Sequence, residues 1–276
     1  MTPKPRLELA VLVMIAAAMH APILGLRHWD PVIYIACLVT ALVLRLRWAI
    51  HAALLTCLLI AIALTPMLRE SVGRMPVLPL LIPLLLSSLA VAAVPVTRPT
   101  LRWLRLGQVD AHAWGLVGLT GVVSAAALIL WAGWTDNLGI GAQMIADFAQ
   151  VPFAVLALLG IPLFALANAF TEEAIFRGVM FTALTASSDS PWLAVVVQAA
   201  AFASLHYEMG FPNGAIGYGM ALGYGLVLGY LRLRTDGLLA PVAAHVIADL
   251  TIGSILVALA AGGNGHGVRH PEWSTH

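Results

Sequence analysis

Residues 171–178 read Thr171-Glu172-Glu173-Ala174-Ile175-Phe176-Arg177-Gly178 and lie between two apolar runs. Charged side chains inside such a segment are costly, and at membrane depth they usually mark a functional site. On a helix, Glu173 and Arg177 share a face at i, i+4 spacing and can pair, whereas Glu172 lies about 140° from Arg177 around the axis. We therefore predict a structural Glu173–Arg177 pair and a chemical role for Glu172. The alternative is a juxtamembrane charge cluster in a loop.

The composition is typical of a multi-pass membrane protein. Hydrophobic residues make up 61% of the 276 residues and charged residues only 10%, whereas soluble domains contain about 25% charged residues. A membrane-spanning helix needs about 20 apolar residues. The chain therefore predicts an all-α fold, a polytopic membrane helical bundle with eight or nine transmembrane helices. The net charge of +1, without a basic arm, gives no indication of nucleic-acid binding.

Nine apolar runs separated by polar joints are the candidate spans. They cover residues 7–26, 31–44, 48–67, 76–96, 114–134, 151–186, 191–206, 215–231 and 238–260. The second run is short and can form a hairpin with its neighbour, which gives the count of eight. With nine spans and a cytoplasmic N-terminus, most of the 14 Lys and Arg residues fall on the inner side. The positive-inside rule then favours this orientation, and we expect a multi-pass protein of a bacterial or archaeal inner or plasma membrane.

The two halves of the chain differ in where their polar residues occur. Before residue 150 the spans carry few charges, and we interpret His20 and His51 there as packed or interfacial histidines. After residue 150, charged and polar residues lie inside the apolar runs. We expect residues 1–150 to form N-terminal transmembrane scaffold helices, residues 151–260 to form the catalytic helical core, and residues 261–276 to form a disordered polar tail.

Polar residues on two later spans can join the glutamates. His206 ends one apolar run, and His245 and Asp249 are at i, i+4 on another, so they project from one helix face. Counted at 1.5 Å per residue from the inner helix ends, these three side chains and the two glutamates lie about 13 to 25 Å deep. Because the hydrocarbon core is about 30 Å thick, we expect all five to meet near the middle of the membrane.

The chemistry open to such a group of side chains is limited. A glutamate beside a histidine, with access to water, can act as a general base on that water. A second histidine with a hydrogen-bonding neighbour can stabilise an oxyanion. This combination predicts hydrolysis of an acyl bond without a covalent intermediate. A zinc site made by two histidines and a glutamate is the chemical alternative, although the spacing is not H-E-x-x-H.

Glycines recur between the helices that carry the two histidines. Several pairs between Gly210 and Gly229 have small-xxx-small spacing, which lets helix backbones approach closely. We interpret the series as close packing around the core, with Tyr218, Tyr224 and Tyr230 as interfacial or lining residues.

Three motifs, taken in order, resemble the CAAX protease and bacteriocin-processing family, also called the Abi family. They are E-E-x-x-x-R from Glu172 to Arg177, F-x-x-x-H from Phe202 to His206, and H-x-x-x-N or D from His245 to Asp249. The resemblance covers about residues 150–255. It implies a helical membrane bundle with a cavity open to the cytoplasmic side. It also implies a CAAX-type intramembrane glutamic protease, similar to the type II endopeptidases that trim prenylated CAAX proteins in eukaryotes.

The resemblance also implies roles for individual residues. Glu172 would be the base that activates water, with His206 assisting. His245 and Asp249 would hold the oxyanion. Residues in structural support of the site would be Glu173, Arg177 and Phe202. No metal and no other cofactor would be needed.

Position 249 departs from the eukaryotic pattern, which has Asn there. An ionised Asp249 cannot donate a hydrogen bond to an oxyanion. Either Asp249 is protonated in its apolar setting, or it orients His245 instead, and we favour the second interpretation.

The expected partners are membrane lipid and a peptide or protein substrate. A prenylated protein, a pheromone or bacteriocin precursor, and a C-terminal sorting tail would all suit a site inside the membrane. One alternative is a non-proteolytic bacteriocin-immunity or partner-binding membrane protein. Another is a proton-coupled transporter in which buried Glu and His relay protons, but no paired inverted repeat of broken helices supports it.

Overall fold

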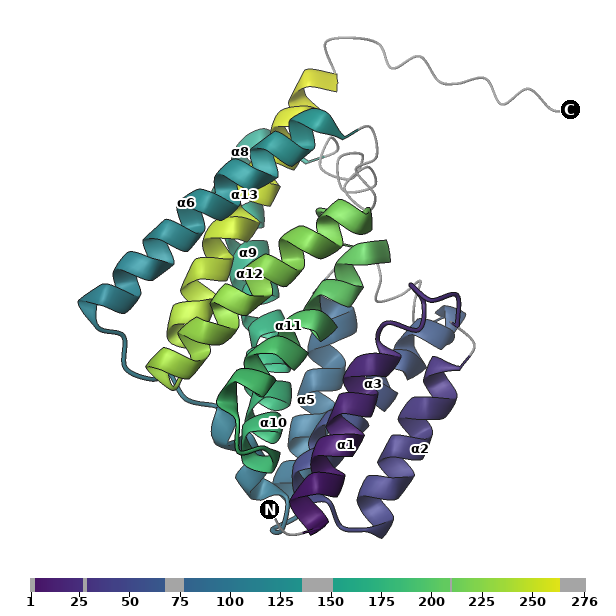
Figure 1. Cartoon of the computed structure of the whole chain (residues 1–276). Coiled ribbons are helices and arrows are strands. Elements are labelled where there is room, and N and C mark those ends of the chain that lie inside the picture. Colours follow the sequence, from purple (N-terminus) through teal and green to yellow (C-terminus); the bar gives the residue numbers. More distant parts are fainter. Residues whose placement is uncertain (1–2, 27–28, 68–76, 136–150, 209, 264–276) are drawn as a thin grey trace, which may run out of the picture.

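The computed structural model of the chain describes residues 3–26, 29–67, 77–135, 151–208 and 210–263 (Figure 1). Every regular element in these residues is a helix, which confirms the all-α prediction. The α-helices are α1 (Pro3–Ala18), α2 (Asp30–Val43), α3 (Arg47–Leu64), α5 (Leu78–Ala93), α6 (Ala111–Trp134), α8 (Phe153–Val155), α9 (Ile161–Glu173), α10 (Phe181–Ser187), α11 (Pro191–Glu208), α12 (Gly214–Thr235) and α13 (Leu239–Gly263). A 3₁₀-helix, η1 (Arg98–Trp103), and two π-helices, η2 (Leu156–Gly160) and η3 (Ala174–Met180), complete the described elements.

Several helical segments are long and apolar enough to cross a membrane. They are Arg47–Leu64, Ala111–Trp134, Leu156–Ser187, Gly214–Thr235 and Leu239–Leu259, and shorter apolar helices cover Asp30–Val43, Leu78–Ala93 and Pro191–Tyr207. The protein is therefore an integral membrane protein with multiple helices, as predicted. The count of eight or nine crossings and the cytoplasmic N-terminus stay predictions.

The helices lie side by side in a bundle (Figure 1). On one side α1, α2, α3 and α5 pack on one another, and on the other side α6 packs on α13 and α12. Between them, α9 and α11 contact both groups. The helices expected to form the N-terminal scaffold thus flank the later helices on two sides. The proposed domain boundaries stay predictions, and most of the tail, residues 264–276, lies outside the described residues.

Two chain joints meet at one end of the bundle. The backbone N–H of Leu238 donates to Arg105 O at 2.9 Å, and that of Gln108 donates to Thr235 O at 2.9 Å. A Cβ on Gly237 would lie 2.1 Å from backbone atoms of residues 106 and 107, so only glycine fits there. In the predicted topology of nine spans with a cytoplasmic N-terminus, these joints follow the fourth and the eighth span and so both lie on the inner side. Their contact requires them to share a side.

Helix α6 begins at this same end with a side-chain cap. The Ala113 N–H donates to Asp110 Oδ1 at 2.7 Å, which satisfies one of the free donors of the first turn. This hydrogen bond holds the pKa of the Asp110 carboxyl below its usual range. Arg234 Nη2 also donates to Asp110 Oδ2 at 2.7 Å, which joins the start of α6 to the end of α12.

Two histidines and a glutamate in the N-terminal part of the bundle have polar neighbours. His51 is buried, with Thr100 Oγ1 3.4 Å from Nδ1 and Ser88 Oγ 3.5 Å from Nε2. His20 Nδ1 donates to Ala16 O at 3.0 Å. These contacts agree with the interpretation of both residues as packed histidines. Glu8 on α1 was not anticipated: it is only 4% exposed, and Oε1 accepts from the Trp48 N–H at 3.3 Å.

Candidate active site

The stretch from Thr171 to Gly178 lies on one continuous helical segment made of α9, η3 and α10. Glu172 and Glu173 end α9, and Arg177 lies in the π-helix η3. The spacing predicted an α-helix throughout, so the π turn is a correction. Such i→i+5 turns are rare and occur frequently at functional sites. Arg232, a buried side chain of α12, supports this turn because its Nε donates to Arg177 O at 2.9 Å.

Glu173 and Arg177 form the predicted ion pair. Arg177 Nη1 donates to Glu173 Oε1 at 2.8 Å, and both side chains are fully buried. Arg177 Nη2 donates to Gly225 O at 3.4 Å. The guanidinium carbon lies 4.5 Å from the centroid of the Phe202 ring, which is a cation–π contact. Arg177 is therefore fixed by groups from α9, α11 and α12.

Glu172 has a different environment from its neighbour. Its side chain is 15% exposed. Asn168 Nδ2 donates to its Oε1 at 3.3 Å, and its Oε2 lies 3.6 Å from His245 Nε2. Of the two adjacent glutamates, Glu172 is the one that is not paired with Arg177 and is partly accessible.

His245 on α13 is held by Glu173. The two atoms His245 Nδ1 and Glu173 Oε1 are 2.7 Å apart, and because a carboxylate only accepts, the ring donates through Nδ1. Nε2 is then directed at Glu172 and at Asp249 Oδ1, which lies 3.7 Å away. The 3.7 Å between His245 Nε2 and Asp249 Oδ1 is an ion-pair distance but too long for a hydrogen bond, so the orienting role of Asp249 stays a prediction. Asp249 Oδ2 instead accepts from Asn168 Nδ2 at 3.1 Å.

His206 and Phe202 come from α11. His206 Nδ1 donates to Phe202 O at 3.2 Å, which leaves Nε2 of this ring available. The ring centroid lies 4.6 Å from that of Phe202, and Glu172 and His245 are both within electrostatic range of His206. The Phe202 ring also lies edge-on to His245, with centroids 6.0 Å apart. The fold thus brings together side chains from all three motifs.

Asn168 was missed by the sequence reasoning. It lies four residues before Glu172 on α9, and its amide joins Glu172 to Asp249. The same i, i+4 rule that paired Glu173 with Arg177 places Asn168 on the face of Glu172. A polar amide inside the apolar run 151–186 could therefore have indicated a further residue of the site.

A metal site would need several ligand side chains close together in the described residues. No group of three or more His, Cys, Asp and Glu side chains among them is arranged to hold a metal ion. The zinc alternative is therefore left to a direct metal measurement.

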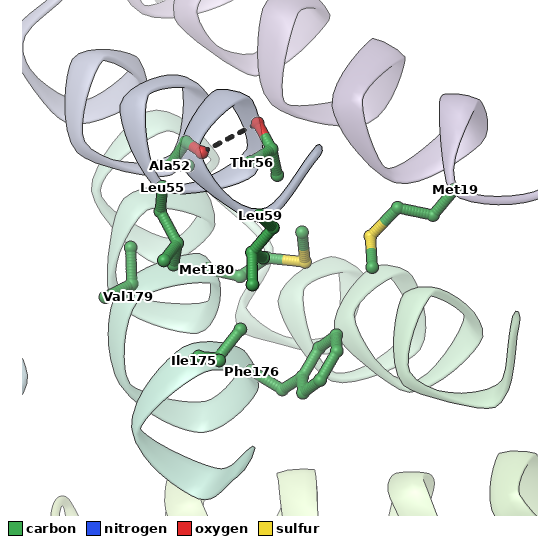
Figure 2. A pocket seen from close by; sticks show the side chains of 9 residues that line it. All are labelled: Met19, Ala52, Leu55, Thr56, Leu59, Ile175, Phe176, Val179 and Met180. Carbon is green, nitrogen blue, oxygen red and sulfur yellow. Dashed lines mark hydrogen bonds between the residues drawn. The ribbon is translucent and has the colours of Figure 1, made fainter. Parts of the chain in front are cut away.

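An apolar pocket lies against a different side of η3 (Figure 2). Its lining consists of Met19, Ala52, Leu55, Thr56, Leu59, Ile175, Phe176, Val179 and Met180, and its empty volume, which includes the open mouth, is about 280 Å³. The one hydroxyl, on Thr56, donates to the backbone oxygens of Ala52 and Ala53, both at 3.0 Å. This pocket therefore offers apolar contact and no chemistry.

Carboxylates and histidines gathered between apolar helices define a candidate hydrolase site inside a membrane protein. Residues 154–251 match the family model described as Type II CAAX prenyl endopeptidase Rce1-like. The match confirms the resemblance to the CAAX protease family over these residues, which include every candidate active-site residue named above. The matched family is described as an endopeptidase family, which supports a protease activity for this protein. Comparisons with curated proteins and with solved structures gave no match.

Proposed function

We propose that the protein is an intramembrane endopeptidase in which Glu172 activates a water molecule against a peptide bond. The observation that carries this proposal is the difference between the two adjacent glutamates. Glu173 is fully buried and is engaged by Arg177 and His245, whereas Glu172 is partly exposed and faces His245 Nε2. A general base must reach the proton that it removes, and of the two only Glu172 has that access.

The reaction follows from these positions. Glu172 takes a proton from water, and the resulting hydroxide attacks the scissile carbonyl carbon. His245, protonated at Nε2, donates a hydrogen bond to the oxyanion that forms. Glu172 then returns its proton to the leaving nitrogen, with His206 assisting through its available Nε2. The C–N bond breaks to give a carboxylic acid and an amine, and no covalent intermediate with the protein is formed.

The remaining residues hold this arrangement. Glu173 fixes the His245 ring through Nδ1 and is itself neutralised by Arg177. Asn168 donates to both Glu172 and Asp249, so Asp249 acts on the base through this amide. Phe202 supports the site through its ring contacts with Arg177, His206 and His245.

The substrate we propose is a membrane-associated peptide or protein. The description of the matched family names prenyl CAAX endopeptidases, and a lipidated peptide or a C-terminal sorting tail would both place a scissile bond close to the bilayer. We propose that the site is reached from the cytoplasmic side, in the inner or plasma membrane of a bacterial or archaeal cell.

The purified protein in detergent tests the proposal. A panel of prenylated and unmodified peptides is offered to the wild type and to Glu172→Ala, and the products are identified by mass. We expect cleavage by the wild type alone, and we expect it to persist in the presence of a chelator. Metal analysis of the same sample addresses the zinc alternative, which stoichiometric zinc with chelator-sensitive cleavage would favour. Equal cleavage by both proteins would remove Glu172 from the mechanism.

A further inference from the structure

Tyr224 on α12 has a buried hydroxyl with no hydrogen-bond partner among the described residues. A buried polar group without a partner is costly in apolar surroundings and requires an explanation, of which a catalytic role is one. The other two tyrosines of α12 are occupied elsewhere. The Tyr218 hydroxyl lies 3.2 Å from His20 Nε2, and the Tyr230 ring stacks on Trp192 with centroids 6.0 Å apart.

The Tyr224 ring is fixed beside the candidate active site. It lies edge-on to His245, with ring centroids 5.7 Å apart and planes at 87°. The phenol is within electrostatic range of Glu172, Glu173, Asp249 and Arg177. Its ring packs against three hydrophobic clusters of the core. The next residue, Gly225, accepts from both Arg177 and Gln198, so this turn of α12 is tied to the site.

The site is rich in acceptors and poor in available donors. Its three carboxylates accept when ionised. The Asn168 amide donates to two of them, and His245 Nδ1 donates to the third. Arg177 Nε also has no partner among the described residues, but the guanidinium is fully buried against the face of Phe202. Among the described residues of the site, two donors therefore stay available: the Tyr224 hydroxyl and, when the ring is protonated, Nε2 of the neighbouring His245.

We propose that Tyr224 is a catalytic residue whose hydroxyl donates a hydrogen bond to the oxyanion on the scissile carbonyl, together with His245 Nε2. This inference rests on the proposed endopeptidase function. The phenol stays protonated and neutral throughout the reaction, so it adds a donor to the site without adding a charge. It supplies a hydrogen-bond donor for the oxyanion, which an ionised Asp249 cannot do.

The test compares Tyr224→Phe with Tyr230→Phe in the full-length protein. Both substitutions remove one hydroxyl from α12, and Tyr224→Phe keeps the ring that packs on His245. Loss of one oxyanion donor lowers kcat by about 100-fold or more. We therefore expect a loss of this size in Tyr224→Phe, with unchanged KM and unchanged melting temperature. Tyr230→Phe should behave as the wild type.

A binding measurement separates this role from a structural one. A peptide phosphonate, which carries the tetrahedral charged oxygen, should bind Tyr224→Phe more weakly than it binds the wild type. An uncleaved peptide with the same side chains should bind both equally. A wild-type kcat in Tyr224→Phe, or an equal loss in Tyr230→Phe, would overturn the role of Tyr224 and leave Glu172 catalysis intact. A wild-type protein that neither cleaves any peptide nor binds the phosphonate would overturn both proposals.

Discussion

The π-helix η3 has two sides that differ in chemistry. Toward α11 and α12 it presents Arg177, which is bound to Glu173 and to Gly225 O. Toward α3 it presents Ile175, Val179 and Met180, which line the apolar pocket (Figure 2). Charges buried in an apolar bundle persist only where partners are fixed around them, whereas the pocket side needs only apolar shape. One short helix therefore separates the candidate active site from the apolar pocket.

Removal of Arg177 should have the largest effect on this arrangement. Arg177→Ala leaves the buried carboxylate of Glu173 without its cation, and breaking a buried pair in this way costs about 3–5 kcal/mol. We expect a strongly lowered melting temperature in detergent and loss of cleavage. Val179→Ala, on the pocket side, is the matched control and should destabilise less and keep cleavage. An unchanged melting curve for Arg177→Ala would contradict the bracing role.

Substitution of Asp249 should have a smaller effect than loss of Arg177, and it should lower the cleavage rate and not the melting temperature. Asp249→Leu removes one of the two acceptors of Asn168. We expect cleavage to fall by about 10- to 100-fold, the loss typical when a carboxylate that supports a metal-ligating side chain is removed. Asp249→Asn keeps a carbonyl that can accept from Asn168, so it should keep substantial cleavage. Rates of both variants, measured beside their melting curves, check this order. Full activity in Asp249→Leu would remove the residue from the site.

The pocket side should tolerate the loss of its one hydroxyl. Thr56 donates only to backbone oxygens of its own helix, and such local bonds add little to helix stability. Thr56→Val replaces the hydroxyl with a methyl group of similar size and should leave both cleavage rate and melting temperature close to wild type. A large loss of activity in this variant would mean that the pocket has a polar function and that the contrast between the two sides is wrong.

Within the candidate site, the sequence could predict the contacts between residues of the same helix. The Glu173–Arg177 pair follows from i, i+4 spacing, because four residues return a helix to the same face. The motif order then identified the histidines and Asp249 as neighbours. Asn168 was missed although the same spacing rule reaches it.

Contacts between helices could not be predicted in detail. Counting residues from the helix ends gives the depth of His245 and Glu173 but not the rotation of their helices. Their hydrogen bond joins residues that are 72 positions apart in the sequence, and no spacing rule predicts it. The π turn at Arg177 also changes the direction in which the following side chains of this helix point. No residue between Thr171 and Gly178 predicts this turn. Glu8 was overlooked because its partner, a backbone N–H of α3, has no signature in the sequence.

The most direct measurement compares Glu172→Gln with Glu173→Gln in one cleavage and melting assay. A glutamine at 172 can still accept from Asn168 but cannot take a proton from water. We predict that Glu172→Gln abolishes cleavage and melts as the wild type does. Glu173→Gln removes the charge that faces Arg177 and should lower both the melting temperature and the rate. Cleavage by Glu172→Gln at a rate close to that of the wild type would contradict the assignment of Glu172 as the base.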